Sequence, residues 1–318
     1  MAGKAPGKHY RKGMTLIDLF EMFPDDETAE KWFEESRWPD GVRCAHCDGE
    51  NVSKAKHPTM PYWCKDCRKF FSVKHGTVMQ SSKVGYQKWA LAIYILTTQI
   101  KGASSMKLHR DIGVTQKTAW HMAHRIRETW ATDTPSFAGP LEVDETYIGG
   151  KEKNKHSDKK LNAGRGTVGK AVVAGAKDRD SGQVNAQVVP DTTKQTLHDF
   201  VEERADFHAT VYTDEHRGYR GIPFEHETVN HSVSEYVRDQ AHVNGLESFW
   251  ALLKRGYHGT YHHMSGKHLS RYVNEFSGRH NDRPSDTIEQ MTNMAQGLTG
   301  KKLRYKDLIA GGPAYPEW

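Results

Sequence analysis

The chain has 318 residues, a formal net charge of +5 and a pI near 8.8, and 36% of its residues are hydrophobic. This length has room for two or three domains. The longest apolar run, WALAIYIL at residues 89–96, is far shorter than the roughly 20 residues that cross a bilayer, which excludes a membrane span. The first residues also lack the apolar core of a secretory signal, and we therefore expect a soluble protein of the cytoplasm.

Positive charge is concentrated in particular stretches of the chain. Residues 1–13 hold four Lys or Arg and no acid, which predicts a basic tail. Residues 101–127 hold six Lys or Arg against a single acid, Asp111. A loop at residues 151–165 has six against two, and it either contacts a phosphate backbone or is simply solvated. This distribution favours an anionic partner.

All the cysteines lie in two C-x2-C pairs separated by sixteen residues, namely Cys44, Cys47, Cys64 and Cys67. Four thiolates suit the closed tetrahedron of a structural zinc ion. Two disulfides are the alternative, which the geometry of C-x2-C and a cytosolic location disfavour. His46 and His75 lie nearby but are not needed as ligands. Short strands with aromatic residues around the cysteines predict a zinc ribbon at residues 39–80, after N-terminal helices that end near residue 38.

The next stretch, residues 81–135, predicts a helix pair for binding DNA. Residues 86–100 are apolar enough for a buried helix, and a helix, a turn at Gly113 and a second helix capped by Thr115 follow. In a helix-turn-helix the start of the second helix enters the major groove, which selects Gln116, Lys117 and Thr118. A plain helical hairpin is the alternative, but the ribbon and the local charge favour DNA.

From residue 136 the pattern changes to that of an α/β domain. One strand carries Asp144, two more strands and a helix capped by Thr192 follow, and a short strand ends at Asp214. A helix between the third and fourth strands implies a parallel crossover, so the sheet is mixed. With a final helix that carries Glu247, this order suits a ribonuclease H-like domain at residues 136–290, followed by a C-terminal extension at 291–318.

That final helix has two distinct faces. Helical spacing puts Asn244, Glu247 and Lys254 on one side. The opposite side is apolar and is expected to pack into a core; its members are Leu246, Phe249, Trp250, Leu252 and Leu253.

Three acids from separate elements would converge at one edge of such a sheet. Converging carboxylates repel one another, and two Mg²⁺ ions, or Mn²⁺ in their place, remove that cost. One ion activates water or a 3′-hydroxyl, and the other stabilises the leaving oxygen. Glu145 and Glu215 adjoin the aspartates, but strand alternation directs them to the other side. We therefore predict Asp144, Asp214 and Glu247 as the metal ligands.

The blocks EVDETYIGGK, VYTDEHRGY and HVNGLESFWALLKRGYHGTYHHMSGKHLSRYVNEFSGRHN resemble those of the DDE transposases of bacterial insertion sequences, specifically the ISXO-type family with an N-terminal zinc ribbon. The resemblance runs from the ribbon to about residue 283. It implies that Asp144 and Asp214 are the first two acids and Glu247 the third, with Asn244 as the alternative ligand because some members use asparagine. It also implies that Lys254, and Arg255 beside it, contact DNA.

The activity implied by this resemblance is metal-dependent cleavage at transposon ends and joining of the freed 3′-hydroxyl to target DNA. The expected partners are double-stranded terminal inverted repeats and target DNA, bound by a homodimer or a higher oligomer in the cytoplasm, at the nucleoid. Two rival functions stay open. One is a DNA-binding regulator with an inactive acidic domain, and the other is a nuclease of the same fold that cuts without joining.

Overall fold

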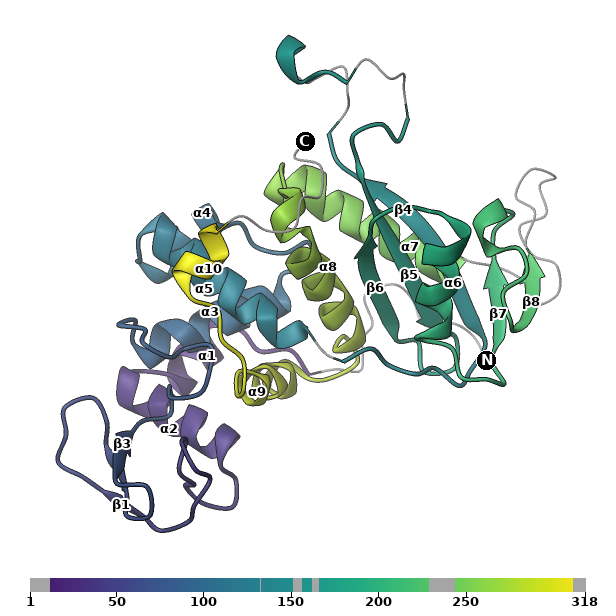
Figure 1. Ribbon diagram of the computed structural model, residues 1–318. Coiled ribbons are helices and arrows are strands. Elements are labelled where there is room, and N and C mark those ends of the chain that lie inside the picture. The colour runs from purple at the N-terminus through teal and green to yellow at the C-terminus, as the bar shows by residue number, and fades with distance from the viewer. Residues whose placement is uncertain (1–11, 132, 151–155, 162–165, 229–243, 311–318) are drawn as a thin grey trace. The chain divides into compact units, whose positions relative to one another are not determined.

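The computed structural model describes residues 12–131, 133–150, 156–161, 166–228 and 244–310 (Figure 1). The expected basic tail up to residue 11 and most of the basic loop at 151–165 lie outside the described residues. Contacts divide the chain into two compact units, Met1–Trp130 with Asp282–Ile309, and Ala131–Asn281 with Ala310–Trp318. The first unit is therefore built from two segments that are far apart in the sequence.

The first unit has a helical core around α3 (Tyr86–Thr98). Helix α3 is buried on nearly all sides, as its composition predicts, and it packs against α2 and α9. Met291 and Met294 of α9 belong to the same apolar cluster as Trp89, so the later segment completes this core. The other helices of the unit are α1 (Leu16–Met22), α2 (Asp26–Arg37), α4 (Ser105–Ile112), α5 (Gln116–Arg127), the 3-10 turn η1 (Glu128–Trp130), α9 (Thr287–Gly297) and α10 (Tyr305–Ile309).

Helices α4 and α5 are joined by the predicted turn. Gly113 ends α4 with φ 61° and ψ 49°, a left-handed conformation in which glycine has no steric cost. The hydroxyl of Thr115 accepts a hydrogen bond from the N–H of Thr118 at 3.2 Å and so caps α5. Both local predictions are confirmed.

The cysteine region forms a three-stranded antiparallel sheet of β1 (Val52–Lys54), β2 (Tyr62–Cys64) and β3 (Lys69–Phe71), in the order β1-β2-β3. Its small core contains Cys44, Tyr62, Cys64 and Phe71. So small a core stabilises little on its own, which makes a metal link important for this fold.

The second unit is built on a mixed sheet of five strands in the order β6-β5-β4-β7-β8. The bounds are β4 (Leu141–Ile148), β5 (Ala171–Asp178), β6 (Val184–Val189), β7 (Thr210–Thr213) and β8 (Glu225–Thr228). Strand β5 is antiparallel to β4 and β6, whereas β7 is parallel to β4 and to β8. The predicted mixed sheet is confirmed, and β8 is a fifth strand that the sequence analysis missed.

Helices cover both faces of this sheet (Figure 1). Helix α6 (Lys194–Glu202) packs on one face with residues such as Val143 and Val172. Helices α7 (Asn244–Gly256) and α8 (Gly266–Asn281) pack on the other face with Val173 and Val184. Short turns complete the unit: η3 (Ser157–Lys159), η4 (Arg217–Tyr219) and the π-helical η6 (Tyr257–Tyr261).

The cap of α6 lies one residue later than predicted. Thr193, not Thr192, accepts the hydrogen bond from the N–H of Thr196. The Thr193 hydroxyl also donates to Asp191 at 2.7 Å, and this turn fixes the start of the helix.

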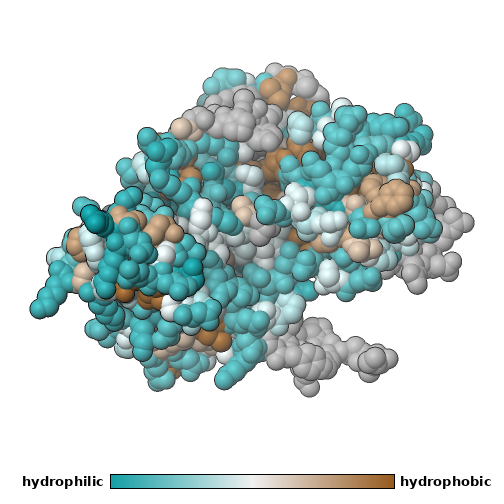
Figure 2. Space-filling view, turned by 60° about the horizontal axis from the view of Figure 1, so that its bottom comes forward, coloured by the Kyte–Doolittle hydropathy of each residue, from teal (hydrophilic) through white to brown (hydrophobic). Residues whose placement is uncertain are grey.

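The surface drawn in Figure 2 is mainly hydrophilic, with apolar residues in separate patches. None of the helices within the described residues is both long and apolar enough to span a membrane.

Gly175 lets helix α7 approach the sheet closely. A Cβ atom at this position would lie 2.6 Å from the Trp250 ring. We therefore expect Gly175→Ala to lower the free energy of unfolding of this unit by about 1–3 kcal/mol, the usual cost of overpacking. Urea unfolding followed by tryptophan fluorescence measures the change. Gly150→Ala, where a Cβ meets nothing within 4 Å, is the matched control, and equal midpoints for the two variants would contradict the close packing.

Candidate active site and zinc centre

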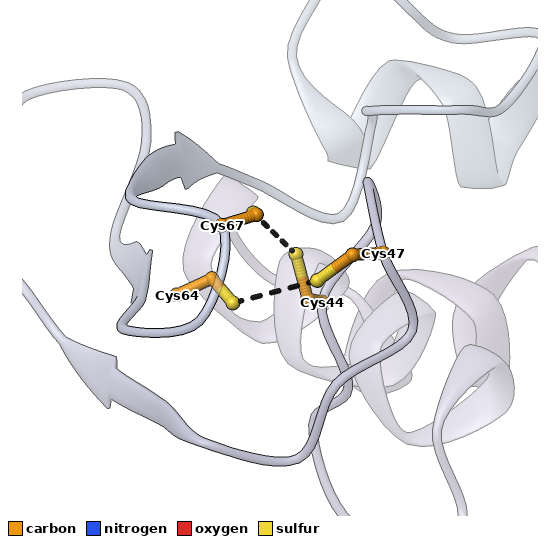
Figure 3. Close-up of side chains that lie close together, drawn as sticks. All are labelled: Cys44, Cys47, Cys64 and Cys67. Carbon is orange, nitrogen blue, oxygen red and sulfur yellow. Dashed lines mark hydrogen bonds between the residues drawn. The ribbon is translucent and has the colours of Figure 1, made fainter.

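The four cysteine side chains point toward one another in the ribbon (Figure 3). Their sulfur atoms all lie within 4.8 Å of one another, with Cys44 Sγ 3.6 Å from Cys67 Sγ and Cys47 Sγ 3.7 Å from Cys64 Sγ. These separations are too long for disulfides, and all four cysteines are free thiols. A tetrahedral zinc ion with Zn–S bonds of about 2.3 Å needs sulfur atoms about 3.8 Å apart. The cluster therefore fits one structural zinc ion.

Asp144 and Asp214 come from neighbouring parallel strands. The β4–β7 pairing ends with Glu142 opposite Tyr212, so Asp144 on β4 and Asp214 just after β7 each lie two residues beyond it in the same direction, and the charge of Asp214 acts on Asp144. Asp214 directly follows β7, and its Oδ1 accepts the N–H of His216 at 2.9 Å. Both aspartates are half-buried. The two strands thus bring together the first two predicted acids.

The proton affinity of Asp144 reflects this environment. Burial, followed by the negative charges of Glu145 and Asp214, raises the pKa of Asp144 from its usual value to about 7. The hydrogen bond from Trp250 opposes this rise without cancelling it. The position therefore has an excess of negative charge whenever Asp144 is ionised.

Trp250 connects the helix α7 to Asp144. The indole Nε1–H donates to Asp144 Oδ2 at 2.9 Å. The ring lies against Gly175, which is the direct cross-strand partner of Asp144 on β5. Sequence analysis placed Trp250 in the core, where only 4% of it is exposed, but did not anticipate this hydrogen bond. Asp144 therefore faces the helix that carries Glu247.

A buried glutamate holds the first turn of the same helix. Glu142, two residues before Asp144 on β4, is 1% exposed, and its Oε2 accepts the N–H of Leu246 at 3.3 Å. Its Oε1 accepts from Arg179 Nε at 3.0 Å. A carboxylate at a helix N-terminus also interacts favourably with the helix dipole. Sequence reasoning missed Glu142, although it stands in the same EVDE block as Asp144.

Glu145 belongs to the opposite face of the sheet, as strand alternation predicts. Its Oε2 accepts the hydroxyl of Tyr219 at 2.8 Å. Tyr219 is fully buried in the cluster beneath α6 and lies five residues after Asp214. The pKa of Glu145 is raised, first by burial. The hydrogen bond from Tyr219 to Glu145 connects the segment after β7 to β4. Glu215, the other neighbouring glutamate, is exposed.

The polar side of α7 lies in solvent. Glu247 is in its first turn, and Glu247, Lys254 and Arg255 are exposed. On the predicted apolar side, Leu246, Phe249, Trp250 and Leu253 are buried and Leu252 is half-buried, so that side does pack into the core. Among the described residues, the three acids do not form a group whose ligand atoms all lie within 4.8 Å of one another. The side chain of Asn244 lies outside the described residues.

The candidate DNA-reading residues lie at the start of α5. Gln116 and Lys117 are exposed and Thr118 is half-buried. Gln116 Nε2 donates to Ser105 Oγ at 2.9 Å, and Lys117 Nζ lies 4.5 Å from the centre of the Tyr305 ring. The short helix α10 therefore lies beside the start of α5.

Comparison with known proteins identifies the family of this chain. Residues 136–281 match the family described as "ISXO2-like transposase domain", and residues 24–70 match "Transposase zinc-ribbon domain". Over 274 residues the chain is 30% identical to "Uncharacterized protein in transposable element ISH50" of Halobacterium salinarum, which covers 81% of this chain and 92% of that protein. The chain belongs to the ISXO2-like transposases with an N-terminal zinc ribbon.

A solved structure gives a more distant likeness. It is the "CryoEM structure of simian T-cell lymphotropic virus intasome in complex with PP2A regulatory subunit B56 gamma", at 15% identity over 59% of this chain and 65% of that chain. Its TM-score of 0.27 is too low to show a common fold.

The zinc centre makes a direct prediction about metal content. Wild-type protein should bind about one zinc ion per chain, and Cys64→Ser should lose most of it because a closed site needs four ligands. The variant's first unit should also unfold at a lower temperature, since the metal supplies folding free energy. Atomic emission and thermal melting measure both effects. His46→Ala is the control and should keep its zinc; full zinc in Cys64→Ser would refute the four-thiolate site.

The raised pKa of Asp144 predicts a pH-dependent stability. Because this carboxyl binds its proton more tightly in the folded chain, its contribution to stability is lost as the pH rises from about 4 to about 7. Asp144→Asn cannot ionise yet still offers Trp250 an acceptor. Its free energy of unfolding should exceed that of wild type by about 1–2 kcal/mol at pH 8, after allowance for solvent screening. This difference between the two proteins should shrink as the pH is lowered.

Thermal melting in buffers without divalent cations or chelators tests this expectation. The exposed Glu215→Gln provides the control and should show no such pH dependence. A constant difference between Asp144→Asn and wild type at every pH would contradict the predicted ionisation.

Proposed function

We propose that this transposase cleaves the ends of its mobile element and joins the freed 3′-hydroxyl groups to target DNA. Water and then the 3′-hydroxyl attack phosphodiesters directly, without a covalent enzyme intermediate. The main support is that Asp144 on β4 and Asp214 just after the neighbouring β7 lie at the same end of these two strands. Asp144 also accepts a hydrogen bond from Trp250 of the helix that carries Glu247. The strand order and directions of the sheet also suit a ribonuclease H-like domain.

The proposed metal ligands are Asp144, Asp214 and Glu247, with Asn244 as the alternative to Glu247. Carboxylate oxygens are the hard ligands that Mg²⁺ prefers. The raised pKa of Asp144 fits such a role, because the uncompensated negative charge that causes it is what a divalent cation would offset. Two magnesium ions, or manganese ions in their place, supply Lewis-acid activation of the attacking oxygen and stabilise the leaving oxygen when bound.

Other side chains of the chain would bind and orient the DNA. Lys254 lies seven residues after Glu247, about two helical turns along α7, and both are exposed. We propose that Lys254 and Arg255 hold a phosphate of the end DNA close to the acids. Trp250 fixes the rotation of α7 through its bond to Asp144, so that these charged residues face outward.

The ribbon at residues 39–80 and a helix-turn-helix at 81–135 are proposed to recognise the terminal inverted repeats. In the helix-turn-helix, Gln116, Lys117 and Thr118 would enter the major groove. Lys117 would then leave its contact with the Tyr305 ring and contact DNA. The proposed catalytic domain is residues 136–290. Joining requires two ends, so we propose a homodimer or a larger oligomer on DNA, in the cytoplasm at the nucleoid.

Cleavage and joining by single-residue variants test this proposal. In Mg²⁺, with DNA that carries the element's ends, Asp144→Ala, Asp214→Ala and Glu247→Ala should each lose about a thousandfold in rate. Loss of a ligand removes several kcal/mol of transition-state stabilisation, and each tenfold corresponds to about 1.4 kcal/mol. All three should still bind the ends, because the DNA-reading region is untouched. Gel assays of cut and joined products, with band shifts, measure both properties.

Two variants make the test specific. Glu215→Ala adjoins Asp214 but is exposed, and it should remain active. If Asn244→Ala is inactive while Glu247→Ala is active, the third ligand is Asn244. Cleavage without joining by wild type would assign a nuclease, and binding without cleavage would assign a regulator.

A further inference from the structure

The zinc-ribbon sheet has an aromatic row on the face away from its core. Tyr62, Cys64 and Phe71 point into the core cluster. On the other face, the register aligns Ser53, Trp63 and Phe70 across the three strands. Neither Trp63 nor Phe70 belongs to any of the buried clusters of the described residues.

The rings of this row lie in contact. The centres of Trp63 and Phe70 are 4.6 Å apart, and the ring of His57 is 5.2 Å from Phe70 at an interplanar angle of 35°. Phe70 is 39% exposed, and Trp63 and His57 are half-buried. We call Trp63, Phe70 and His57 the ribbon aromatic face. Single apolar residues are common on protein surfaces, whereas several in contact often mark a binding site. Three neighbouring rings on so small a domain therefore indicate a binding surface.

The charge around this face indicates the kind of partner. Residues 51–75 contain six Lys or Arg and one acid, Asp66. Lys54 and Lys69 are the cross-strand partners of Tyr62 and Cys64, so alternation assigns them to the opposite side of the sheet, whereas Lys56 and Arg68 lie just outside the strands, close in sequence to His57 and Phe70. The exposed basic residues are Lys54, Lys56, Lys65, Arg68 and Lys69, and none of them forms an ion pair within the described part of the chain. Aromatic rings flanked by unpaired positive charge match the bases and phosphates of a nucleic acid.

The neighbouring cavity is a weaker candidate. It has a volume of about 660 Å³ and is lined by Lys74, His75 and Tyr86, but also by the carboxylates of Asp26 and Glu30. Those acids would repel a phosphate, whereas the ribbon aromatic face has no acid in its row.

We propose that the ribbon aromatic face stacks on unpaired bases of a DNA strand, with the exposed Lys56, next to His57, and Arg68, in the turn between β2 and β3, contacting the adjoining phosphates. Bases inside a duplex are covered by their neighbours, so aromatic rings on an open sheet can stack only on bases that are unpaired or at an end. The inference rests on the proposed function in naming DNA, because a protein that opens and joins DNA ends exposes such bases. Recognition of the double-stranded repeat would remain with α4 and α5 and with the parts of the ribbon outside this face.

Binding of a labelled single-stranded oligonucleotide to the full chain tests the proposal. Buffers contain no divalent cation, so that cleavage cannot occur, and a duplex of the same sequence is titrated in parallel. Trp63→Ala and Phe70→Ala should each weaken single-strand binding about 5- to 150-fold, since stacking on an aromatic ring contributes about 1–3 kcal/mol per base. Duplex binding should change less than about threefold, and Trp63→Phe should keep most of the single-strand affinity.

Matched variants separate stacking from other effects. Phe207→Ala removes an aromatic residue that is 81% exposed but lies outside the ribbon, and it should bind as wild type does. Lys56→Gln with Arg68→Gln should reduce the slope of log affinity against log salt for the single strand by about 1.4. Zinc content shows that each ribbon variant is folded.

Three results would overturn the proposal. The first is wild-type single-strand affinity in zinc-loaded Trp63→Ala and Phe70→Ala. The second is equal loss of single-strand and duplex binding, which would indicate a backbone contact. The third is loss of self-association on size-exclusion chromatography with DNA binding unchanged, which would assign the face to a protein partner. Because the assay needs no chemistry, a chain that neither cuts nor joins DNA would refute the proposed function without touching this result.

Discussion

The hydrogen bond from the Trp250 indole to Asp144 is the contact on which the arrangement of the acidic site depends. It joins the helix of one acid to the strand of another, and Gly175 makes room for it. Two more bonds act alongside it, from the N–H of Leu246 to Glu142 and from Tyr219 to Glu145. All three acceptors stand within four residues of β4. One strand therefore positions the two other elements that carry the candidate acids, which is the kind of support that a proposed catalytic site needs.

The groups that donate hydrogen bonds to Glu142, Asp144 and Glu145 differ in charge. This difference distinguishes a carboxylate whose charge is compensated from two whose charge is not. Glu142 is paired with Arg179, so its negative charge is compensated and it can remain deep in the protein. Asp144 and Glu145 receive an indole N–H and a phenol O–H, which are neutral. Such donors orient a carboxylate but leave its charge available to a cation. An arginine in place of Trp250 would also hydrogen-bond Asp144, but its positive charge would weaken the attraction of Asp144 for the proposed metal ions.

Much of this structure follows from sequence patterns, and the failures have physical reasons. Strand-like runs of the sequence predicted β4 to β7, and helical spacing predicted which side of α7 is buried. Strand β8, Glu225–Thr228, has no apolar residue and lies mostly exposed next to β7. Backbone pairing and polar contacts across the two strands, such as Thr213 Oγ1 to His226 Nε2 at 2.9 Å, define it, and no apolar pattern marks it in the sequence. Glu142 and Tyr219 were missed because their importance lies in contacts across the fold. The one-residue error at Thr192 arose because adjacent threonines offer equivalent caps, and the turn at Asp191 decides between them.

The division of the first unit has a consequence for biosynthesis. Its core includes Trp89 from the first segment and Met291 and Leu298 from near the end of the chain, while Ala131–Asn281, the main part of the second unit, is encoded between them. Trp130 Nε1 and Asp282 Oδ2, at the two junctions, lie 3.3 Å apart. Domains commonly fold in the order in which they leave the ribosome. Here the order is reversed: the intervening segment, Ala131–Asn281, can fold on the nascent chain first. The segment that precedes it must wait until translation is almost finished before its own core closes.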